Sequence, residues 1–291
     1  MVDVILCGRP FAQLETLAEA FHPKRVRRTA SPVEALRLCG VEEDEDREDL
    51  AALPVRAAEI RADHFIVPEG FSVKRFKLAC FDMDSTLTRN ECIDDMAALV
   101  GKGEEVARIT REAMEGKLPF AENLRRRVAI LEGFPKALLD KVNAETRLQA
   151  GAEAWIGFLQ KHGVRCAIVT GGFTDSAAAL GKRLGIDLWI SNTLEWTDEA
   201  LMTGRVFGPA GGRILDADGK RRALEVLASA AHLSLAQTIA AGDGANDLEM
   251  IGAAGFGFAF HGKPVVEAAA PHAVRFGGLD VAMLAFVEAW S

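Results

Sequence analysis

Short apolar runs that end in small or acidic residues recur along this chain and predict buried strands that lead into loops. These runs lie at residues 78–81, 164–169, 238–241 and 255–260. After residue 149 they alternate with helical patterns, and this order favours parallel strands joined by right-handed crossovers. The pattern therefore predicts an α/β fold with a Rossmann-like parallel sheet, built from residues 73–90 and 149–291.

Residues 91–148 show a different pattern, in which apolar positions recur with the period of a helix and no strand pattern is present. The helices expected there are 94–100, 104–114, 120–131 and 136–142. Because this segment is inserted between the first two core strands, we expect it to form a helical cap over the site where those strands end. A local excursion of β structure is also expected at 187–190, 193–196 and 202–206.

Residues 1–70 form a third region, for which the pattern predicts a small, separate α+β domain. A strand is expected at 1–7, a helix at 11–21 and a further strand within 59–67. A proline and a glycine at 68–70 indicate the linker to the rest of the chain.

Two charged segments lie inside that first region. The basic residues are Lys24, Arg25, Arg27 and Arg28. We interpret them as the solvated face of a strand rather than as an anion site. The acidic run at 42–46 is interpreted as a solvated loop or the start of a helix.

Two carboxylates, Asp82 and Asp84, come directly after the apolar run at 78–81. Alternate side chains of a strand point the same way, so these two anions would lie side by side at a strand end. Desolvated like charges repel each other, and a hard cation such as Mg²⁺ is the best reason for holding them together. The alternative is an ordinary strand that ends in an Asx or Ser/Thr turn.

Two further segments place polar residues where a strand ends or a helix starts. Thr170, Gly171 and Gly172 follow the run at 164–169. Glycine amides in front of a helix favour an anion, although a turn with a threonine N-cap is the ordinary alternative. Lys220 lies near the start of a predicted helix, where a cation opposes the helix dipole. Its ordinary alternative is a solvated surface lysine.

The last of these segments is the loop at 242–247, which follows the run at 238–241 and contains Asp243 and Asp247. A turn explains the glycines of this loop, but it does not explain two more carboxylates at a strand end. Ligands of parallel sheets bind at the carboxyl ends of the strands. We therefore expect the four segments to meet at one site.

The composition limits the classes of function. Of the 291 residues, 49% are hydrophobic, which is typical of a globular protein. The net charge of −8 argues against nucleic acid or an anionic membrane as a partner, and no segment approaches the roughly 18 apolar residues of a membrane span. The chain start lacks the basic region of a signal peptide. Five cysteines without a Cys-x-x-Cys pair indicate reduced thiols in a cytoplasmic protein.

The motifs occur in the order Asp-x-Asp, Thr, Lys and Asp, which resembles the haloacid-dehalogenase (HAD) superfamily of phosphohydrolases with an aspartate nucleophile. Within it, the sequence is most similar to the phosphoserine phosphatase family. The strings that carry the resemblance are FDMDSTLT at 81–88, ECID at 91–94, TGGF at 170–173 and GDGAND at 242–247. The resemblance runs from about residue 75 to the C-terminus. In that family an ACT-like or ferredoxin-like regulatory module often precedes the catalytic part, which the order of elements in residues 1–70 permits.

The resemblance implies catalytic roles for three residues. Asp82 is expected to be the nucleophile that takes over a phosphoryl group. Asp84 is expected to protonate the leaving oxygen and then to activate water. Lys220 would offset the negative charge around Asp82, and we prefer it to Arg221 and Arg222 because it stands at the helix entry.

The implied cofactor is Mg²⁺, held by the carboxylates of Asp82 and Asp243 and by the backbone carbonyl of Asp84. Asp247 would anchor metal-bound water or the loop. The residues expected to bind the phosphate are Thr170, Gly171 and Asn246.

The implied substrate is O-phospho-L-serine, a small phosphomonoester whose ammonium and carboxylate need partners in the cap. By resemblance, Glu91 meets the ammonium and Arg127 the carboxylate, in a bidentate fork. Glu91 could instead be a helix-start acid, and Arg125 or Arg126 could replace Arg127, because three arginines are consecutive. The residues expected to line the pocket are Met114 and Phe120.

The resemblance thus implies Mg²⁺-dependent hydrolysis of phosphoserine through an aspartyl-phosphate, the last step of serine biosynthesis. One alternative is a phosphatase or phosphotransferase of the same fold that acts on a related phosphomonoester such as phosphohomoserine. Another is a receiver-like phospho-accepting switch, and a third is a silent amino-acid-binding regulator in which residues 1–70 are the active part. A homodimer is compatible with the sequence.

Overall fold

The computed structural model describes residues 1–8, 10–44, 46–114 and 119–290 of the chain. In these ranges the strands are β1 (Val2–Cys7), β2 (Arg25–Thr29), β3 (Ala35–Val41), β4 (Asp63–Pro68), β5 (Leu78–Phe81), β6 (Arg165–Phe173), β7 (Trp189–Trp196), β8 (Met202–Phe207), β9 (Thr238–Gly242), β10 (Phe256–Phe260) and β11 (Ala273–Val274). The α-helices are α1 (Phe11–Ala18), α2 (Arg47–Glu59), α3 (Cys92–Leu99), α4 (Gly103–Met114), α5 (Phe120–Ile130), α6 (Lys136–Glu145), α7 (Ala152–Lys161), α8 (Thr174–Leu184), α9 (Ala217–Ala230), α10 (Leu248–Ala253) and α11 (Pro264–Ala269). The strands form one sheet in the order β2-β3-β1-β4-β11-β10-β9-β5-β6-β7-β8.

The centre of the sheet is parallel, as the sequence predicts: β10, β9, β5, β6 and β7 all run in the same direction. Its central strands are apolar because both faces are covered. In β5, Ala79 and Phe81 belong to the core on one face, and Leu78 and Cys80 belong to the core on the other. This alternation carries the chain to the sheet's carboxyl edge, where Asp82 follows.

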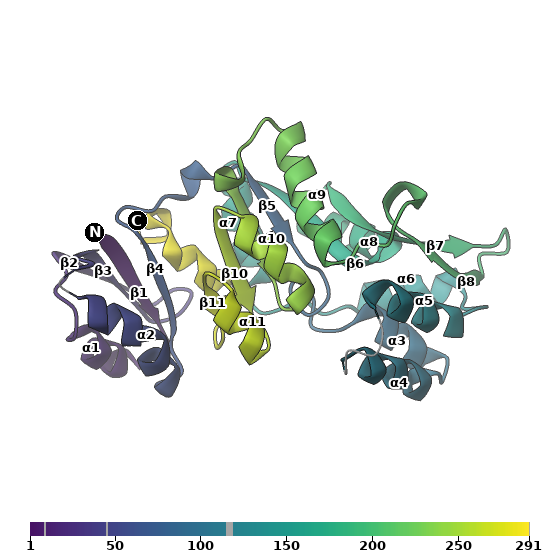
Figure 1. Ribbon diagram of the computed structural model, residues 1–291, viewed down its shortest axis with the longest axis horizontal. Coiled ribbons are helices and arrows are strands. Elements are labelled where there is room, and N and C mark those ends of the chain that lie inside the picture. Colours follow the sequence, from purple (N-terminus) through teal and green to yellow (C-terminus); the bar gives the residue numbers. More distant parts are fainter. Residues whose placement is uncertain (9, 45, 115–118, 291) are drawn as a thin grey trace.

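The insertion expected at residues 91–148 is helical, and α3, α4, α5 and α6 lie at one end of the molecule together with the β7–β8 hairpin (Figure 1). A separate apolar cluster joins these helices to the hairpin, with Leu124 and Val128 of α5 packed in the same cluster as Met202 and Val206 of β8. The first cap helix begins at Cys92, two residues earlier than expected.

The β excursion differs from the prediction in one respect. The two strands expected at 187–190 and 193–196 are a single strand, β7, because Ser191 and Asn192 continue the pairing with β6. Both residues are polar but buried. The antiparallel partner expected at 202–206 is present as β8.

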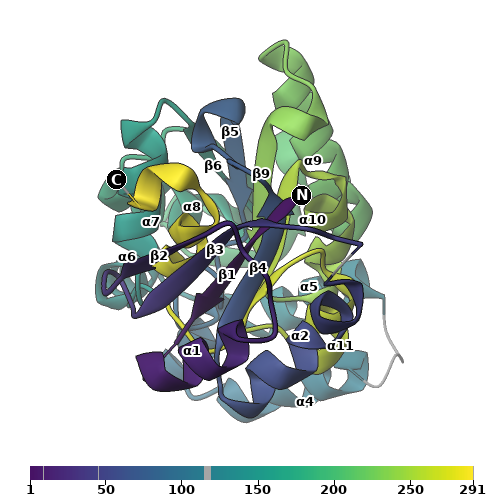
Figure 2. The ribbon, with the colours of Figure 1, turned by 90° about the vertical axis from the view of Figure 1, so that its left-hand side faces the viewer.

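Residues 1–70 contain the element order β1-α1-β2-β3-α2-β4, with β1, β3 and their neighbours paired antiparallel around their own apolar cluster (Figure 2). This is the order of a ferredoxin-like unit. Strand β3 and helix α2 are additions to the expected elements. Strand β2 agrees with the interpretation of the basic residues as a strand face. The sheet of this unit continues into the core, because β4 pairs with β11. A regulatory role for these residues stays a prediction.

All five cysteines are buried and free, and Cys80 and Cys166 lie in core strands. None of the helices in the described ranges is both long and apolar enough to cross a membrane.

Candidate active site

Lys220 is the buried centre of the candidate site. It lies in the first turn of α9, whose N-cap Asp216 accepts a hydrogen bond from the N–H of Gly219. Its Nζ is 2.8 Å from Oδ1 of Asp82 and 2.6 Å from Oδ1 of Asp247. The side chain is only 1% exposed, so the reading as a solvated surface lysine is wrong. Burial alone lowers the pKa of a lysine, but the Asp247 and Asp82 carboxylates outweigh it and raise the pKa of Lys220, which keeps the ammonium charged.

Three carboxylates form a cluster, and two of them contact this ammonium. Oxygen atoms of Asp82, Asp243 and Asp247 all lie within 4.8 Å of one another. Burial, then the Asp82 and Asp247 charges, raise the pKa of Asp243 to about 7. Burial and Asp82 raise the pKa of Asp247 to about 6, although Lys220 opposes the shift. Such a cluster of hard oxygen donors fits a divalent cation, which would relieve the repulsion between the carboxylates.

The loop after β9 needs its glycines because acidic and amide side chains fold back over it. A Cβ at Gly242 would lie 2.2 Å from Cγ of Asp247, and a Cβ at Gly244 would lie 2.2 Å from Oδ1 of Asn246. The N–H of Gly244 donates to Oδ2 of Asp247 at 3.0 Å, and Thr86 Oγ1 donates to Oδ1 of Asp243 at the same distance. These contacts fix the loop carboxylates against the end of β5.

Thr170 and Gly171 lie within β6 itself, which runs on to Phe173 before α8 begins. Thr170 therefore does not cap the helix, whose N-cap is Phe173. The N–H of Gly172 donates to Thr170 Oγ1 at 2.9 Å. A Cβ at Gly171 would meet the Phe120 ring at 2.8 Å, so a cap residue packs directly against this segment.

Asn192, a fully buried residue of β7, supports the same segment and was not anticipated from the sequence. Its Nδ2 donates to the carbonyl of Gly171 at 2.8 Å, and its Oδ1 accepts from the N–H of Leu215 at 2.8 Å. The side chain thus ties the Thr170–Gly171 backbone to the turn that leads into α9 and Lys220. The sequence pattern placed Asn192 in the gap between two expected strands and gave no signal of this role.

Asp84 lies between the sheet and the cap. Its Oδ1 accepts from the N–H of Cys92 at 3.1 Å, and a Cβ at Gly172 would come within 2.8 Å of its Oδ2. Burial, followed by the charges of Glu91 and Asp82, raises the pKa of Asp84. A carboxyl held in this way can keep a proton at higher pH than a free aspartate.

Glu91 and Arg127 face the same cavity from the cap. Ser85 Oγ donates to Oε1 of Glu91 at 3.1 Å. Burial lowers the pKa of Arg127, while Asp94 and Glu91 oppose the shift. Among the described residues, Nε of Arg127 is buried without a hydrogen-bond partner.

The two neighbouring arginines are arranged differently. Arg125 and Arg126 are exposed, and Arg126 pairs with Glu122 one helical turn away at 2.8 Å. Arg127 is the arginine of the three that lines the cavity.

A single cavity of about 730 Å³ collects the side chains from these separate segments. The predicted site residues that line it are Asp82, Asp84, Glu91, Phe120, Arg127, Thr170, Gly171, Lys220, Asp243 and Asn246. The Met114 side chain lies outside the part of the chain that the structure describes in detail. The lining residues that sequence reasoning missed include Asn123, His261 and Lys263.

Comparison with known proteins identifies the family of the chain. A family model described as haloacid dehalogenase-like hydrolase matches residues 76–255. A phosphoserine phosphatase of Streptomyces coelicolor is 44% identical over 232 residues, which cover 80% of this chain and 55% of that protein. The chain therefore matches about half the length of that relative. A phosphoserine phosphatase of a Polaromonas species is 44% identical over 207 residues, which cover 70% of this chain and 87% of that protein.

Among solved structures, a HAD family hydrolase from Salmonella enterica serovar Typhi is similar over 99% of both chains, with a TM-score of 0.88 and 29% identity. The similarity therefore includes the N-terminal unit as well as the core and cap. From these matches together, we conclude that the chain belongs to the haloacid dehalogenase-like hydrolase family, in which phosphoserine phosphatases are among its relatives.

Proposed function

We propose that this chain is a Mg²⁺-dependent phosphoserine phosphatase that hydrolyses O-phospho-L-serine to L-serine and phosphate. The observation that carries the proposal is the composition of one cavity. Asp82 and Lys220 lie at the sheet end of the cavity, and Glu91 and Arg127 lie at its cap end. In a substrate with a phosphate, an ammonium and a carboxylate, the phosphate would meet Asp82 and Lys220, the ammonium would meet Glu91 and the carboxylate would meet Arg127.

In the first step, a carboxylate oxygen of Asp82 attacks phosphorus. The new bond from phosphorus to Asp82 forms as the bond from phosphorus to the serine oxygen breaks, and Asp84 gives its proton to that oxygen. The raised pKa of Asp84 supports this role, because the group must hold a proton when substrate arrives. The products of this step are L-serine and an aspartyl-phosphate.

In the second step, water attacks the aspartyl-phosphate. Asp84, now ionised, accepts a proton from the water, a bond forms between the water oxygen and phosphorus, and the bond to Asp82 breaks. Phosphate is released, and both carboxyl groups return to their starting states.

The residues proposed to hold Mg²⁺ are Asp82 and Asp243, with the backbone carbonyl of Asp84. When bound, the cation would neutralise charge on the phosphoryl oxygens. Asp247 also lies in the acidic cluster, and its ion pair with Lys220 supports an anchoring role for it.

The phosphate-binding groups proposed are the Thr170 hydroxyl, the Gly171 N–H and the Asn246 amide. The N–H of Gly172 already occupies an acceptor position on Thr170 Oγ1, which leaves the hydroxyl hydrogen to donate to a phosphate oxygen. Preorganised donors of this kind act mainly on the charge of the transition state.

Substrate selection is assigned to the cap. The carboxylate of Glu91 would bind the substrate ammonium, and the guanidinium of Arg127 would bind the substrate carboxylate. The unpartnered Nε of Arg127 supports this assignment, because a buried donor without an acceptor is costly unless a ligand supplies one. Phe120 would close the pocket from above Gly171.

A second candidate is a phosphatase of the same fold that acts on a different small phosphomonoester, such as phosphohomoserine. The observation behind it is that the Salmonella structure, which matches this chain throughout, is named only as a HAD family hydrolase. A receiver-like switch is disfavoured, because it has no use for Asp84 or for a cap that carries Glu91 and Arg127. The first proposal also includes a cytoplasmic location and a role in the last step of serine biosynthesis.

The test is a phosphate-release panel with the purified 291-residue chain. The substrates are O-phospho-L-serine, O-phospho-L-threonine, phosphohomoserine and p-nitrophenyl phosphate, each with Mg²⁺ and after removal of divalent cations by a chelator. The highest kcat/KM is expected for O-phospho-L-serine, and only with the cation present. A higher value for phosphohomoserine would favour the second candidate, and stable phosphorylation without turnover would favour a switch.

A further inference from the structure

Asp63, in β4 of the N-terminal unit, holds a segment of the catalytic core. Its Oδ1 accepts hydrogen bonds from the N–H of Arg275 at 2.6 Å and of Phe276 at 3.2 Å, and its Oδ2 accepts from the N–H of Gly277 at 2.8 Å. The residue is 3% exposed. One buried carboxylate therefore fixes three consecutive peptide groups, through charge-assisted hydrogen bonds that are stronger than neutral ones.

The segment at 274–277 also forms hydrogen bonds with His261, which lines the candidate active-site cavity. The ring Nε2 of His261 is 2.8 Å from the carbonyl oxygen of Gly277, and the backbone N–H of His261 donates to the carbonyl of Val274 at 2.8 Å. His261 has a φ of 45°, in the left-handed region that side-chain-bearing residues seldom adopt. Such a conformation persists only where the surroundings enforce it, and the Val274 and Gly277 contacts do so.

The glycines along this route leave no room for a side chain. A Cβ at Gly277 would lie 2.4 Å from Cγ2 of Val281 and 3.0 Å from Oδ2 of Asp63. On the active-site side, a Cβ at Gly262 would lie 3.2 Å from the backbone oxygen of Asp243. The turn at His261 therefore packs against the loop that carries a carboxylate of the acidic cluster.

We propose that the N-terminal unit is a positioning element of the active site, with Asp63 acting through Gly277 on His261. Asp63 and His261 are then positioning residues for the reaction: they hold the cavity wall beside the Asp243 loop. This inference rests on the proposed phosphatase function. It also gives residues 1–70 a task that needs no effector.

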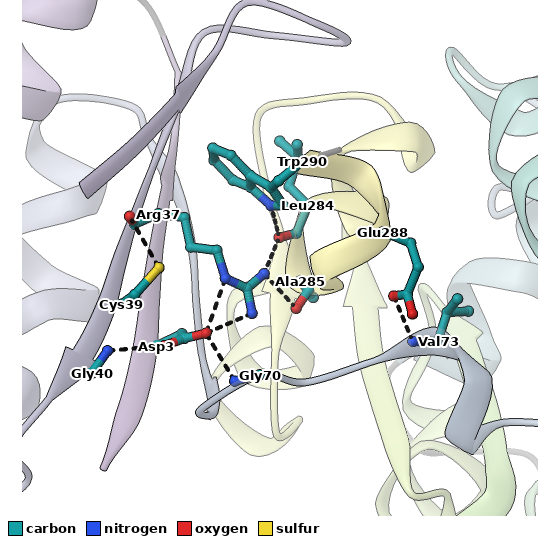
Figure 3. Close-up of polar contacts among 10 residues, drawn as sticks. All are labelled: Asp3, Arg37, Cys39, Gly40, Gly70, Val73, Leu284, Ala285, Glu288 and Trp290. Atoms are coloured by element: carbon teal, nitrogen blue, oxygen red, sulfur yellow. Dashed lines mark hydrogen bonds and ion pairs between the residues drawn. The ribbon is translucent and has the colours of Figure 1, made fainter. Parts of the chain in front are cut away.

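A second buried carboxylate of the same unit supplies a matched control, because its hydrogen-bond network does not reach the active-site cavity. Asp3 is 2% exposed, its Oδ2 lies 2.7 Å from Nη2 of Arg37, and it accepts hydrogen bonds from the N–H groups of Gly40 and Gly70. Arg37 in turn donates to the carbonyls of Leu284 and Ala285, as Figure 3 shows. None of the residues in this second network lines the active-site cavity.

The experiment compares Asp63→Asn and Asp63→Ala with Asp3→Asn in the 291-residue chain. In Asp63→Asn the remaining oxygen can still accept from Arg275 and Phe276, while the new NH₂ faces the N–H of Gly277 and breaks that contact. We expect kcat/KM to fall by about 10-fold, an effect typical of residues that couple through packed segments. Asp3→Asn should lower the melting temperature by about as much as Asp63→Asn does, but it should leave kcat/KM near that of the parent.

Two further variants test whether His261 is the point of action. His261→Ala should lower kcat/KM as Asp63→Asn does, and the double variant Asp63→Asn/His261→Ala should lose no more than His261→Ala alone. His261→Asn should recover part of the loss, because asparagine tolerates positive φ better than alanine does.

Three outcomes would overturn the inference. They are an Asp63→Asn variant that loses stability but keeps kcat/KM, an equal loss of kcat/KM in Asp3→Asn, and additive losses in the double variant. If Asp63→Ala fails to fold, Asp63→Asn carries the comparison. The activity is measured on whichever phosphomonoester the parent hydrolyses fastest. If the parent hydrolyses none of them, the proposed function is refuted; the three outcomes above, in contrast, are differences between an active parent and its variants.

Discussion

Lys220 and Asp247 form a fully buried ion pair, with Nζ of Lys220 2.6 Å from Oδ1 of Asp247. The same ammonium contacts Asp82, so one cation is shared between two of the three clustered carboxylates. Three carboxylates and one ammonium leave two negative charges when all are ionised. That residual charge equals the charge of one divalent cation, which explains how so acidic a cluster can be stable inside the protein.

Removing the ammonium should cost both stability and activity. Lys220→Met leaves Asp247 buried without its partner, and we expect the free energy of unfolding to fall by about 3–5 kcal/mol. Chemical denaturation measures the change. Arg221→Met is the matched control, because Arg221 is an exposed residue on the same helix that pairs with Glu225 at 3.1 Å. Its loss should be about 0.5 kcal/mol or less. Equal losses in the two variants would contradict the central role given to Lys220.

The acidic cluster should make the stability of the cation-free protein depend on pH. The pKa of Asp243 is raised to about 7 and that of Asp247 to about 6 in the folded state. The unfolded chain releases these protons near pH 4, so the folded state binds more protons between about pH 4 and pH 7, and its stability falls as the pH rises through that range.

The measurement is thermal unfolding between pH 5 and pH 8, with a chelator and with Mg²⁺. The melting temperature of the chelated protein should fall with increasing pH, and Mg²⁺ should raise it more at pH 8 than at pH 5, because the ligands must be ionised. Asp243→Asn should flatten the slope and reduce the effect of Mg²⁺. A pH-independent effect of Mg²⁺ would argue against this cluster as the cation site.

Asp82→Asn tests the nucleophile separately from the fold. The amide has nearly the same shape but is not nucleophilic, so turnover should fall by at least about 10³-fold. The fold should survive, because the substitution removes one of three mutually repelling carboxylates while Lys220 keeps Asp247. Circular dichroism and a cooperative thermal transition check the fold. A rate close to that of the parent would refute the assignment.

The residues that the sequence identified share a local signal. Asp82, Thr170 and Asp243 each follow an apolar run, and that pattern alone places them at the carboxyl edge of a parallel sheet. The only sequence signal for Lys220 was its position at a helix entry. Its burial depends on two carboxylates that are distant in sequence. Local patterns therefore predicted where these residues meet in the fold but not the electrostatics of the cavity they line.

The residues that the sequence did not identify depend on partners far along the chain. Asn192 falls between the two strands expected at 187–190 and 193–196, and Asp63 is an acid at the start of a strand. The backbone groups that Asp63 binds lie more than 200 residues later, at Arg275 and its neighbours. No periodicity or local spacing encodes such a contact, because it is created only when the N-terminal unit packs on the core.

Arg127 offers the sharpest test of substrate choice, because the sequence contains its own controls. Three consecutive arginines occupy α5, and each points in a different direction around the helix. Only the direction of Arg127 leads into the cavity, whereas Arg126 pairs with Glu122 at the surface. We expect Arg127→Ala to lower kcat/KM for O-phospho-L-serine by about 100-fold, the loss of a charge-assisted bidentate contact worth about 2–3 kcal/mol.

The matched control is Arg126→Ala, which removes the same charge from the same helix and should change kcat/KM by less than about 2-fold. A second comparison uses p-nitrophenyl phosphate, which has no carboxylate, so Arg127→Ala should leave its hydrolysis nearly unchanged. This selective loss separates substrate recognition from catalysis, since a damaged phosphate site would slow both substrates. Equal losses on both would remove Arg127 from the substrate pocket and shift the assignment to another residue of the cap.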